Sequence, residues 1–338
     1  MRCAAVIAPL ALACQAVAQP GATFCGLGGE FGSRAEAVSA DGLVVVGSLL
    51  GSPQQAIRWT ALSGTEPLGT LPGASSSSAL AASADGSVIV GWSAGPSPSR
   101  AFRWTPSGGM CELLPVPGSM PGAFGTSALA VSADGRTAAG GSGQFAVRWT
   151  STPKGRPLAP LSPLNWALAF GISGDGQAIV GGTAWNGRAF RWSQATGFLD
   201  LGALPFGQDS IAYAANADGW VIVGESAQRA FRWTKAGTMQ AIGGPGLSAA
   251  NAVNASGDVV VGTRYNFQTY RATIWTPTTG SLDIEAVLLA FAVMPDGWTL
   301  TDATGVSADG LTIVGVGRHD DGTTSRTEGW VVTLPYLP

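Results

Sequence analysis

Few residues of this chain are of the types that carry out catalysis or hold metal ions. The sequence has a single histidine, His319, in the run GRHDDGTT, which excludes a zinc site with several histidine ligands. A Ser-His-Asp triad would need this histidine, and no G-x-S-x-G motif accompanies it. His319 and the two aspartates after it could bind a cation or exchange protons, although such a run is more often a solvated turn. We therefore predict no catalytic residue, no metal ligand and no cofactor site.

Chemistry on glycans is the main enzymatic alternative. Tyr265, Tyr270 and His319 are of types that could act as the base of a polysaccharide lyase. Glycoside hydrolysis would need two carboxylates at a defined separation. The acidic residues outside the repeated turns described below are scattered, with no pair at a diagnostic spacing. We therefore expect a protein that does not catalyse a reaction.

The composition limits the class of protein. Of 338 residues, 46% are hydrophobic, 12% are charged and 49 are glycine. Such a chain is too apolar to be disordered and too rich in glycine to be mainly helical. The net charge is -3 and no basic run is visible. Because nucleic-acid binding depends on neutralising phosphates, we do not expect it here.

The first residues have the pattern of a secretory signal peptide. Arg2 supplies the positive charge, the run up to Cys14 is mostly apolar, and Ala16-Val17-Ala18 fits a cleavage site. We predict that residues 1–18 are removed after Ala18. Residues 19–338 would then form one secreted domain that is extracellular, periplasmic or at the cell surface. A lipoprotein acylated at Cys14 is the alternative, and we expect no membrane span because the apolar run is too short.

A unit built around a turn pair occurs seven times, with Asp-Gly in six copies and Ser256-Gly257 in the sixth. Its first copy is AVSADGLVVVG (Ala37–Gly47), and the turn residues of successive copies lie 38 to 53 residues apart. Asp-Gly between two strand-like runs is a strong hairpin signal. A variable loop follows, then a strand such as RAFRWT (Arg100–Thr105), and then a short strand around Leu-Gly. Each unit thus contains about four short strands, which is typical of a propeller blade.

We therefore predict an all-β fold, a seven-bladed β-propeller of four-stranded blades. The chain begins with a Leu-Gly strand (Thr23–Gly29) and ends with an RAFRWT-like strand (Glu328–Pro335). The N-terminal strand is expected to complete the last blade and close the ring, which removes an exposed edge. The segment DIEAVLLAFAV (Asp283–Val293) breaks the pattern and indicates a short buried helix, capped by Asp283 and packed over one face of the ring.

Two further expectations concern side chains in the repeats. Phe and Trp of RAFRWT share one face of their strand, so each copy should place an apolar wedge between blades. The alternate arginine lies on the other face and could pair with the turn aspartate, or that aspartate could serve the turn alone. The arginines are Arg58, Arg103, Arg148, Arg191 and Arg232. Cys25 and Cys111 fall on outer strands of different blades, so we expect two free thiols.

The alternation of A-x-S-A-D-G-x-x-V-V-G with A-F-R-W-T and L-G-x-L-P-G resembles the bacterial extracellular HAF-repeat family. The stretch GWTLTDATGVSADG before the last blade is also similar to that family. The resemblance covers nearly the whole predicted mature chain and implies a secreted, propeller-like protein, but no activity that can be transferred. The family's histidine before Ala-Phe is replaced by Arg100, Arg188 and Arg229. This departure argues against chemistry by histidine in the repeats.

The loops opposite the Asp-Gly turns carry most of the sequence variation, and variable loops on a rigid scaffold tend to carry function. Aromatic residues in or beside them suit stacking on sugars or peptides, unless they only fill the loop layer. The predicted ligand-binding residues are Trp92, Trp185, Tyr265, Phe267, Tyr270 and His319. We expect a monomeric binding scaffold whose partner is an extracellular glycan or protein. A glycan-active enzyme and a structural envelope protein are the alternatives.

Overall fold

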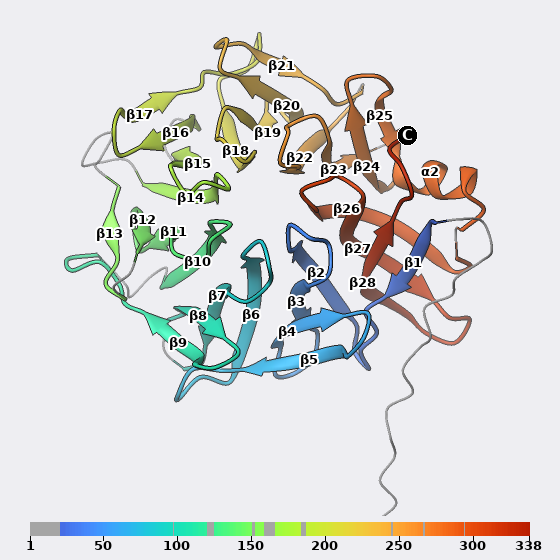
Figure 1. Ribbon diagram of the computed structural model, residues 1–338, viewed down its shortest axis with the longest axis horizontal. Helices are drawn as coiled ribbons and strands as arrows, with labels where there is room; N and C mark the ends of the chain where they lie inside the picture. The colour runs from blue at the N-terminus through green and yellow to red at the C-terminus, as the bar shows by residue number, and fades with distance from the viewer. Residues whose placement is uncertain are drawn as a thin grey trace, which may run out of the picture.

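The computed structural model describes residues 21–338 except 97, 120–124, 151–152, 159–165, 184–186, 245, 266–267 and 294. In this part of the chain the strands form seven antiparallel sheets of four strands each. The sheets stand around a central axis, with the first strand of each sheet innermost (Figure 1). The prediction of a seven-bladed β-propeller is therefore confirmed.

Six blades are continuous in sequence. Blade 1 contains β2 (Ser33–Val38), β3 (Val45–Leu49), β4 (Gln55–Thr60) and β5 (Gly64–Gly69). Blade 2 contains β6 (Ser76–Ala82), β7 (Ile89–Ala94), β8 (Arg100–Thr105) and β9 (Gly109–Leu113). Blade 3 contains β10 (Thr126–Val131), β11 (Ala138–Ser142), β12 (Phe145–Trp149) and β13 (Arg156–Pro157).

The next three blades repeat this order. Blade 4 contains β14 (Ala167–Ile172), β15 (Ala178–Thr183), β16 (Ala189–Ser193) and β17 (Gly197–Asp200). Blade 5 contains β18 (Ser210–Ala215), β19 (Val221–Ser226), β20 (Arg229–Thr234) and β21 (Met239–Ala241). Blade 6 contains β22 (Ser248–Val253), β23 (Val260–Tyr265), β24 (Tyr270–Thr276) and β25 (Gly280–Asp283).

Blade 7 joins the two ends of the described chain. Its first three strands are β26 (Trp298–Val306), β27 (Thr312–Asp320) and β28 (Ser325–Thr333). The outermost strand is β1 (Thr23–Gly26), which pairs antiparallel with β28 so that Phe24 lies opposite Val332. The predicted closure of the ring by the N-terminal strand is confirmed.

In five of the seven copies the turn is held by its own serine and aspartate, whereas Asn216 in blade 5 and Asn254 in blade 6 take the place of the serine. In the first copy, the Ser39 hydroxyl and the Leu43 N–H both donate to Asp41 Oδ1, and the Val44 N–H donates to Ser39 Oγ. Gly42 has a φ of 76°, which favours glycine. The same Ser-Asp bond recurs at Ser83–Asp85, Ser132–Asp134, Ser173–Asp175 and Ser307–Asp309.

Three of the recurring arginines, Arg148, Arg191 and Arg232, reach into the next blade, whereas Arg58 binds Glu66 of its own blade. Arg191 Nε donates to the carbonyl oxygen of Gly219 at 2.8 Å, and Arg232 Nε donates to that of Gly257 at 3.0 Å. The Arg191 guanidinium also lies 4.0 Å from the ring centre of Trp220. At these positions the expected Arg-Asp hydrogen bond is wrong. The aspartate is occupied by its own turn, and the long arginine side chain spans the interface between blades.

The small residue before each turn aspartate, or before Ser256 in the sixth copy, takes part in a backbone hydrogen bond between neighbouring blades. Seven backbone hydrogen bonds of 2.9–3.4 Å connect these positions from blade to blade and return to the first. In each bond the donor is the N–H of this small residue or of the aspartate after it. The acceptor is the carbonyl oxygen of the equivalent small residue in the next blade. The residues are Ala40, Ala84, Ala133, Gly174, Ala217, Ala255 and Ala308. We call this the alanine ring; it joins the blades around the channel.

The glycine that ends each motif copy lies opposite a bulge in the first strand of its blade. In blade 1 the register shifts between Ala35 and Ala37. A Cβ on Gly47 would lie 1.9 Å from the carbonyl oxygen of Arg34, and the six equivalent glycines are as close to their own first strands. Only glycine permits this approach of two backbones.

Apolar side chains fill the space between neighbouring blades, as predicted for RAFRWT. Phe231 and Trp233 of blade 5 pack against Val180, Ala189 and Leu201 of blade 4, and all five are buried. Burying large aromatic side chains of this kind stabilises a fold by roughly 1.5–3 kcal/mol each. The blades therefore depend on one another for their cores.

The predicted helix is present but differs in detail. It is α2 (Ile284–Ala290), and it lies at the rim beside β24 and β25, not over a face of the ring (Figure 1). Ile284 and Leu288 are buried against blades 6 and 7. Asp283 precedes the helix but makes no side-chain cap, because its carboxylate binds Arg264 through two 2.8 Å bonds. No helix in the described ranges is long and apolar enough to cross a membrane.

The two cysteines differ from the expectation in one respect. Cys111 on β9 is an exposed free thiol. Cys25 on β1 is disulfide-bonded, so the expectation of a free thiol is right for Cys111 and wrong for Cys25. The argument from blade geometry excluded only a bond between these two residues, which belong to blades 7 and 2.

Candidate functional site

Each blade has two ends. One end carries the Asp-Gly hairpins, and the other carries the connections between second and third strands and between successive blades. We call the second end the variable-loop face. Among the described residues, a pocket of about 450 Å³ lies at this end of blades 3, 4 and 5. Its size is within the range of small-molecule sites.

The pocket has an apolar wall and a few neutral polar groups. Trp166, Leu168 and Phe170, at the start of β14, form the wall together with Ile211 of β18. Trp166 is 37% exposed and Leu168 is 39% exposed, although both lie beside a cavity. The polar groups are the side chains of Ser127, Gln144 and Thr183. An apolar surface with convergent hydrogen-bonding groups is typical of a binding site.

Two glycines create this pocket. The residue after the motif glycine is Gly141 in blade 3 and Gly182 in blade 4, whereas the other blades have larger residues there. A Cβ on Gly141 would lie 2.5 Å from Leu168 Cδ2, and one on Gly182 would lie 3.3 Å from Ile211. The residues of the other blades are Ser48, Trp92, Glu225, Thr263 and Val316. The volume of the pocket therefore comes from a local departure from the repeat.

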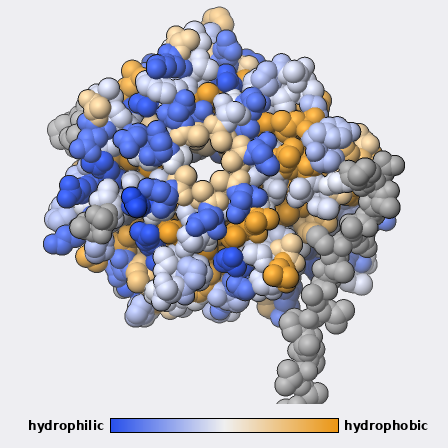
Figure 2. Space-filling model, in the orientation of Figure 1, coloured by the Kyte–Doolittle hydropathy of each residue, from blue (hydrophilic) through white to orange (hydrophobic). Residues whose placement is uncertain are grey.

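The pocket adjoins the central channel at Phe170, which lines both. The channel has a volume of about 390 Å³ and opens at the centre of the ring (Figure 2). The Phe170 ring meets that of Tyr213 edge to face at 5.7 Å. Burial raises the pKa of Tyr213 to about 12, and the Glu225 carboxylate, which accepts its hydrogen bond, adds to this. Burial also raises the pKa of Glu225 above its ordinary value.

The two sides of the channel differ in polarity. The bulged residue of each first strand is apolar or aromatic in blades 2 to 5 and polar in blades 6, 7 and 1. These residues are Leu80, Leu129, Phe170, Tyr213, Asn251, Thr304 and Glu36. On the polar side Asn251 Nδ2 donates to Asp302 Oδ1 at 2.7 Å. Burial raises the pKa of Asp302 to about 6, against the lowering effects of this bond and of Arg34.

Among the described sequence-predicted ligand residues, the structure brings together Tyr265 and Tyr270 but not Trp92. Trp92 lies on β7 of blade 2 and is partly buried, whereas Tyr265 and Tyr270 belong to blade 6. The two tyrosine rings face each other across β23 and β24 at 5.1 Å, and Tyr270 is 55% exposed. Trp185 and Phe267 lie outside the described residues.

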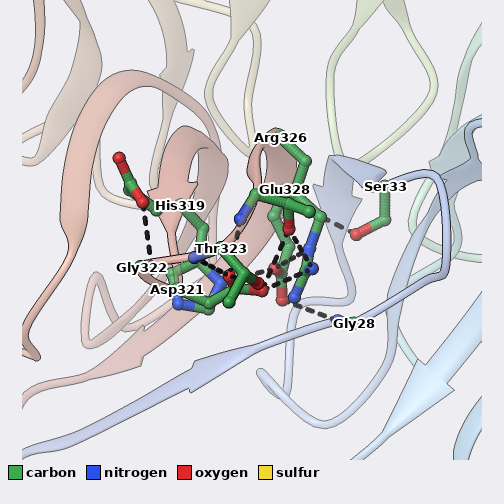
Figure 3. A network of polar contacts seen from close by, with 11 residues as sticks. Gly28, Ser33, His319, Asp321, Gly322, Thr323, Arg326 and Glu328 are labelled. Atoms are coloured by element: carbon green, nitrogen blue, oxygen red, sulfur yellow. Dashed lines mark hydrogen bonds and ion pairs between the residues drawn. The ribbon is translucent and has the colours of Figure 1, made fainter.

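His319 is not part of a solvated turn. It is the next-to-last residue of β27, where its Nδ1 lies 2.8 Å from Glu328 Oε2 (Figure 3). Its ring also stacks on that of Trp298 at 4.5 Å. The Glu328 side chain is only 2% exposed and also accepts bonds from Arg326 Nε and from the Gly28 N–H. This network ties the segment after β1 to β27 and β28. The geometry therefore indicates that His319 stabilises the closure of the ring.

The two aspartates after His319 do form the expected turn. Asp320 Oδ1 accepts the Gly322 N–H, and Asp321 Oδ1 accepts those of Thr323 and Thr324. These hydrogen bonds hold the pKa of Asp321 well below its ordinary value. Across the described ranges, no group of three or more His, Cys, Asp or Glu side chains is arranged to hold a metal ion.

The sequence does not predict the pocket, because the aromatic ligand contacts were expected in or beside the variable loops. Trp166 directly precedes a first strand, and Leu168, Phe170 and Ile211 lie on strands. A signal was nevertheless present: the double glycines Gly140-Gly141 and Gly181-Gly182 occur in two successive copies. Comparing the copies at the position after the motif glycine would have identified these two blades.

The comparisons with known proteins concern the fold. No protein-family model matches the chain, and no curated protein sequence matches it either. Among solved structures it is similar to an oligogalacturonate lyase in complex with manganese, with a TM-score of 0.57 and 11% identity over 95% of this chain and 96% of that one. It is also similar to TolB from Acinetobacter baumannii, with a TM-score of 0.46 and 12% identity over 83% of this chain and 76% of that one. At 11% identity, the similarity to the oligogalacturonate lyase concerns the fold alone.

Proposed function

We propose that this chain is a secreted protein of the HAF-repeat family that binds an extracellular ligand, a glycan or a protein, without transforming it. The observation that carries the proposal is the pocket on the variable-loop face. Exposed Trp166 and Leu168 stand at a cavity that two glycines keep open. Exposed apolar side chains beside a preformed cavity are a feature of binding sites.

The chemical groups in the pocket support a binding role more than a catalytic one. Its neutral hydroxyl and amide side chains can accept and donate hydrogen bonds but are poor general acids or bases. His319, the group best suited to proton transfer, is bonded to Glu328 in blade 7, whereas the pocket lies in blades 3 to 5. The pocket thus has the means to hold a ligand.

The first experiment exposes the purified protein to immobilised polysaccharides and to immobilised extracellular proteins, and records retention together with released sugar. Trp166→Ala should weaken retention by about tenfold, since large aromatic side chains dominate such contacts. Gly182→Ser should do the same by narrowing the pocket, because a Cβ there contacts Ile211. Leu62→Ala is the matched control, since Leu62 is 99% exposed in the β4–β5 hairpin at the opposite end of the blade.

Three outcomes are distinct. Retention that Trp166→Ala and Gly182→Ser weaken, and that Leu62→Ala does not, supports the proposal. Release of sugar by the wild-type protein would show a glycan-active enzyme and contradict the absence of catalysis. Failure to retain either class of ligand, or retention unchanged in both pocket variants, would show that the pocket is not the binding site.

A further inference from the structure

The Asp-Gly pairs that form the hairpins carry a reactivity of their own. In such a pair the glycine amide nitrogen can attack the Cγ carbon of the aspartate, because glycine has no side chain to hinder the approach. The nitrogen loses its proton, the carboxyl group loses an oxygen, and the two leave as water from a succinimide ring. When water opens this ring at the original peptide carbonyl, the main chain runs through Cγ. The product is isoaspartate, which lengthens the backbone by a carbon atom.

In five hairpins a serine hydroxyl opposes this reaction. In blade 3 the Ser132 hydroxyl donates to Asp134 Oδ1 at 2.6 Å, and the Arg136 N–H donates to the same oxygen at 2.9 Å. The bond from Ser132 is the largest of the effects that lower the pKa of Asp134. An ionised carboxylate that is held in place is a poor target for a nucleophile. The other aspartates with a serine hydroxyl donor are Asp41, Asp85, Asp175 and Asp309.

The hairpin of blade 5 lacks this protection. Asn216 stands in the place of the serine, and its amide nitrogen donates to the carbonyl oxygen of Ala255. Within the described part of the chain, the Asp218 carboxylate accepts a hydrogen bond only from the Trp220 N–H, at 3.0 Å. This donor is shared, because it also lies 3.1 Å from Asn216 Oδ1. Asp218 is therefore the most weakly held aspartate of the six Asp-Gly hairpins.

In other respects this hairpin matches the rest. Gly219 has a φ of 70°, and the equivalent glycines have values of 66° to 83°. Its N–H donates to the Asn216 carbonyl at 3.1 Å, as the equivalent N–H groups do at 2.9–3.1 Å. Asp218 is exposed, as are the other five aspartates. The Arg191 guanidinium interacts with both Asp175 and Asp218, so it does not distinguish blade 5 from blade 4. The missing hydroxyl donor is the difference.

We propose that Asp218-Gly219 is the hairpin of the ring that isomerises, so that blade 5 acquires an isoaspartate as the protein ages. This modification is independent of the proposed function. It would also affect the interface between blades 4 and 5. The Ala217 carbonyl accepts the Asp175 N–H at 3.0 Å, and the Gly219 carbonyl accepts Arg191 Nε at 2.8 Å. Because the added carbon atom lies between these two carbonyl groups, isomerisation should disturb both bonds.

Two Asp-Gly pairs outside the hairpins serve as references. The Asp321 carboxylate accepts the hydroxyl groups of Thr323 and Thr324, so this pair should resist isomerisation. Asp296 is exposed, and its carboxylate accepts no hydrogen bond from the described residues. The pair Asp296-Gly297 should therefore react about as readily as the blade 5 hairpin.

The test is to incubate the purified protein at mildly acidic pH and body temperature for several weeks. Isoaspartate at each Asp-Gly pair is then quantified by peptide mapping with electron-transfer fragmentation. It should form about tenfold faster at Asp218 than at Asp134, which is the effect expected from the loss of a hydrogen bond to a charged group. Asn216→Ser restores the hydroxyl and should slow Asp218 by the same factor. Ser132→Ala removes the hydroxyl in blade 3 and should accelerate Asp134 correspondingly.

Two controls separate the hydroxyl from general effects. In urea, where the chain is unfolded, all Asp-Gly pairs should react at similar rates. In the folded variants, only the pair beside the substitution should change its rate, whereas a change in overall stability would move the rates of the other hairpins too. Equal rates at Asp218 and Asp134 in the folded wild type would overturn the inference. So would an absence of isoaspartate at Asp218, or an unchanged rate there in Asn216→Ser.

Discussion

At the scale of single residues, the repeat motif separates positions fixed by geometry from positions free to vary. The motif glycines meet a carbonyl oxygen of the first strand, and the turn serine and aspartate hold a hairpin. The glycine recurs in every blade and the Ser-Asp pair in five of the seven, with asparagines in its place in blades 5 and 6, and these roles say nothing about ligands. The informative residues are those that depart from the repeat, such as Gly141 and Gly182, which open the pocket. Departures from a local rule are where functional residues are expected.

Asp302 is a departure whose effect can be measured by pH. Its pKa is raised from 3.8 to about 6 in the folded protein, mainly by burial. Between pH 4 and pH 6 the unfolded chain therefore loses this proton first, so Asp302 makes the protein less stable as the pH rises, and it stays so above pH 6. Asp302→Asn should be about 2 kcal/mol more stable than the wild type at pH 7 and nearly equal to it at pH 4.

Urea unfolding at the two pH values measures this difference, with Asp296→Asn, an exposed aspartate, as the control. Equal stabilisation by Asp302→Asn at both pH values would mean that the carboxyl group is not the cause. A loss of stability at pH 7 would mean that the charged form is favoured by Arg34 more than burial disfavours it.

At the scale of elements, the strands follow directly from the sequence. Asp-Gly between apolar runs defined the first hairpin of each blade, and RAFRWT defined the third strand. The fourth strands were harder to place because they are short and partly exposed, as β13 and β21 show. The position of the helix in the sequence was predicted correctly, but it lies at the rim and not over a face of the ring. Its predicted cap was also wrong, because tertiary structure provided Arg264 as a better partner for Asp283.

The candidate site was less predictable than the strands for a physical reason. A pocket between blades depends on how the side chain of one copy meets the backbone of the next, as Ile211 does above Gly182. The spacing of residues along one copy does not contain this information. His319 shows the same limit, because its partner Glu328 and its stacking partner Trp298 come from neighbouring strands. The prediction of secretion and the resemblance to the HAF-repeat family stay predictions.

The contact of Glu328 with the segment after β1 leads to an element-scale prediction. Glu328→Gln keeps the size of the side chain but removes the charge that binds Arg326 and His319. The loss of one partner from a buried ionic group is costly, so the free energy of unfolding should fall by about 3 kcal/mol. Chemical denaturation measures this change. The exposed residue Glu30 provides the control variant Glu30→Gln, which should change stability by less than about 0.5 kcal/mol. Unchanged stability in Glu328→Gln would mean that the network does not hold the closure.

At the scale of the whole molecule, the ring is closed in two different ways. The alanine ring connects all seven blades by backbone hydrogen bonds, including the one from Ala308 to Ala40 between the last blade and the first. Blade 7 adds a second closure, because its outer strand β1 comes from the opposite end of the chain. Only the second closure depends on the position of the chain ends, because it requires a blade with strands from both ends of the chain.

Two circular permutants distinguish these closures. In a permutant made from residues 21–338, a short linker can join the two ends of that segment, because Gly21 lies against Pro335. A permutant opened between β8 (ends at Thr105) and β9 (begins at Gly109) again builds one blade from both ends of the chain. A permutant opened between β5 and β6, within residues 70–75, builds every blade from continuous sequence.

The first permutant should unfold at the wild-type temperature, whereas the second should unfold about 5 °C lower, since only packing and the alanine ring then join its first and last blades. Calorimetry compares the two. Both permutants should retain the ligand of the wild type, because the pocket lies in blades 3 to 5, away from either cut. Equal unfolding temperatures would show that packing and the alanine ring alone hold the propeller closed. In that case β1 would serve to cover the edge of β28, and the Glu328 network would be an attachment for the N-terminal segment.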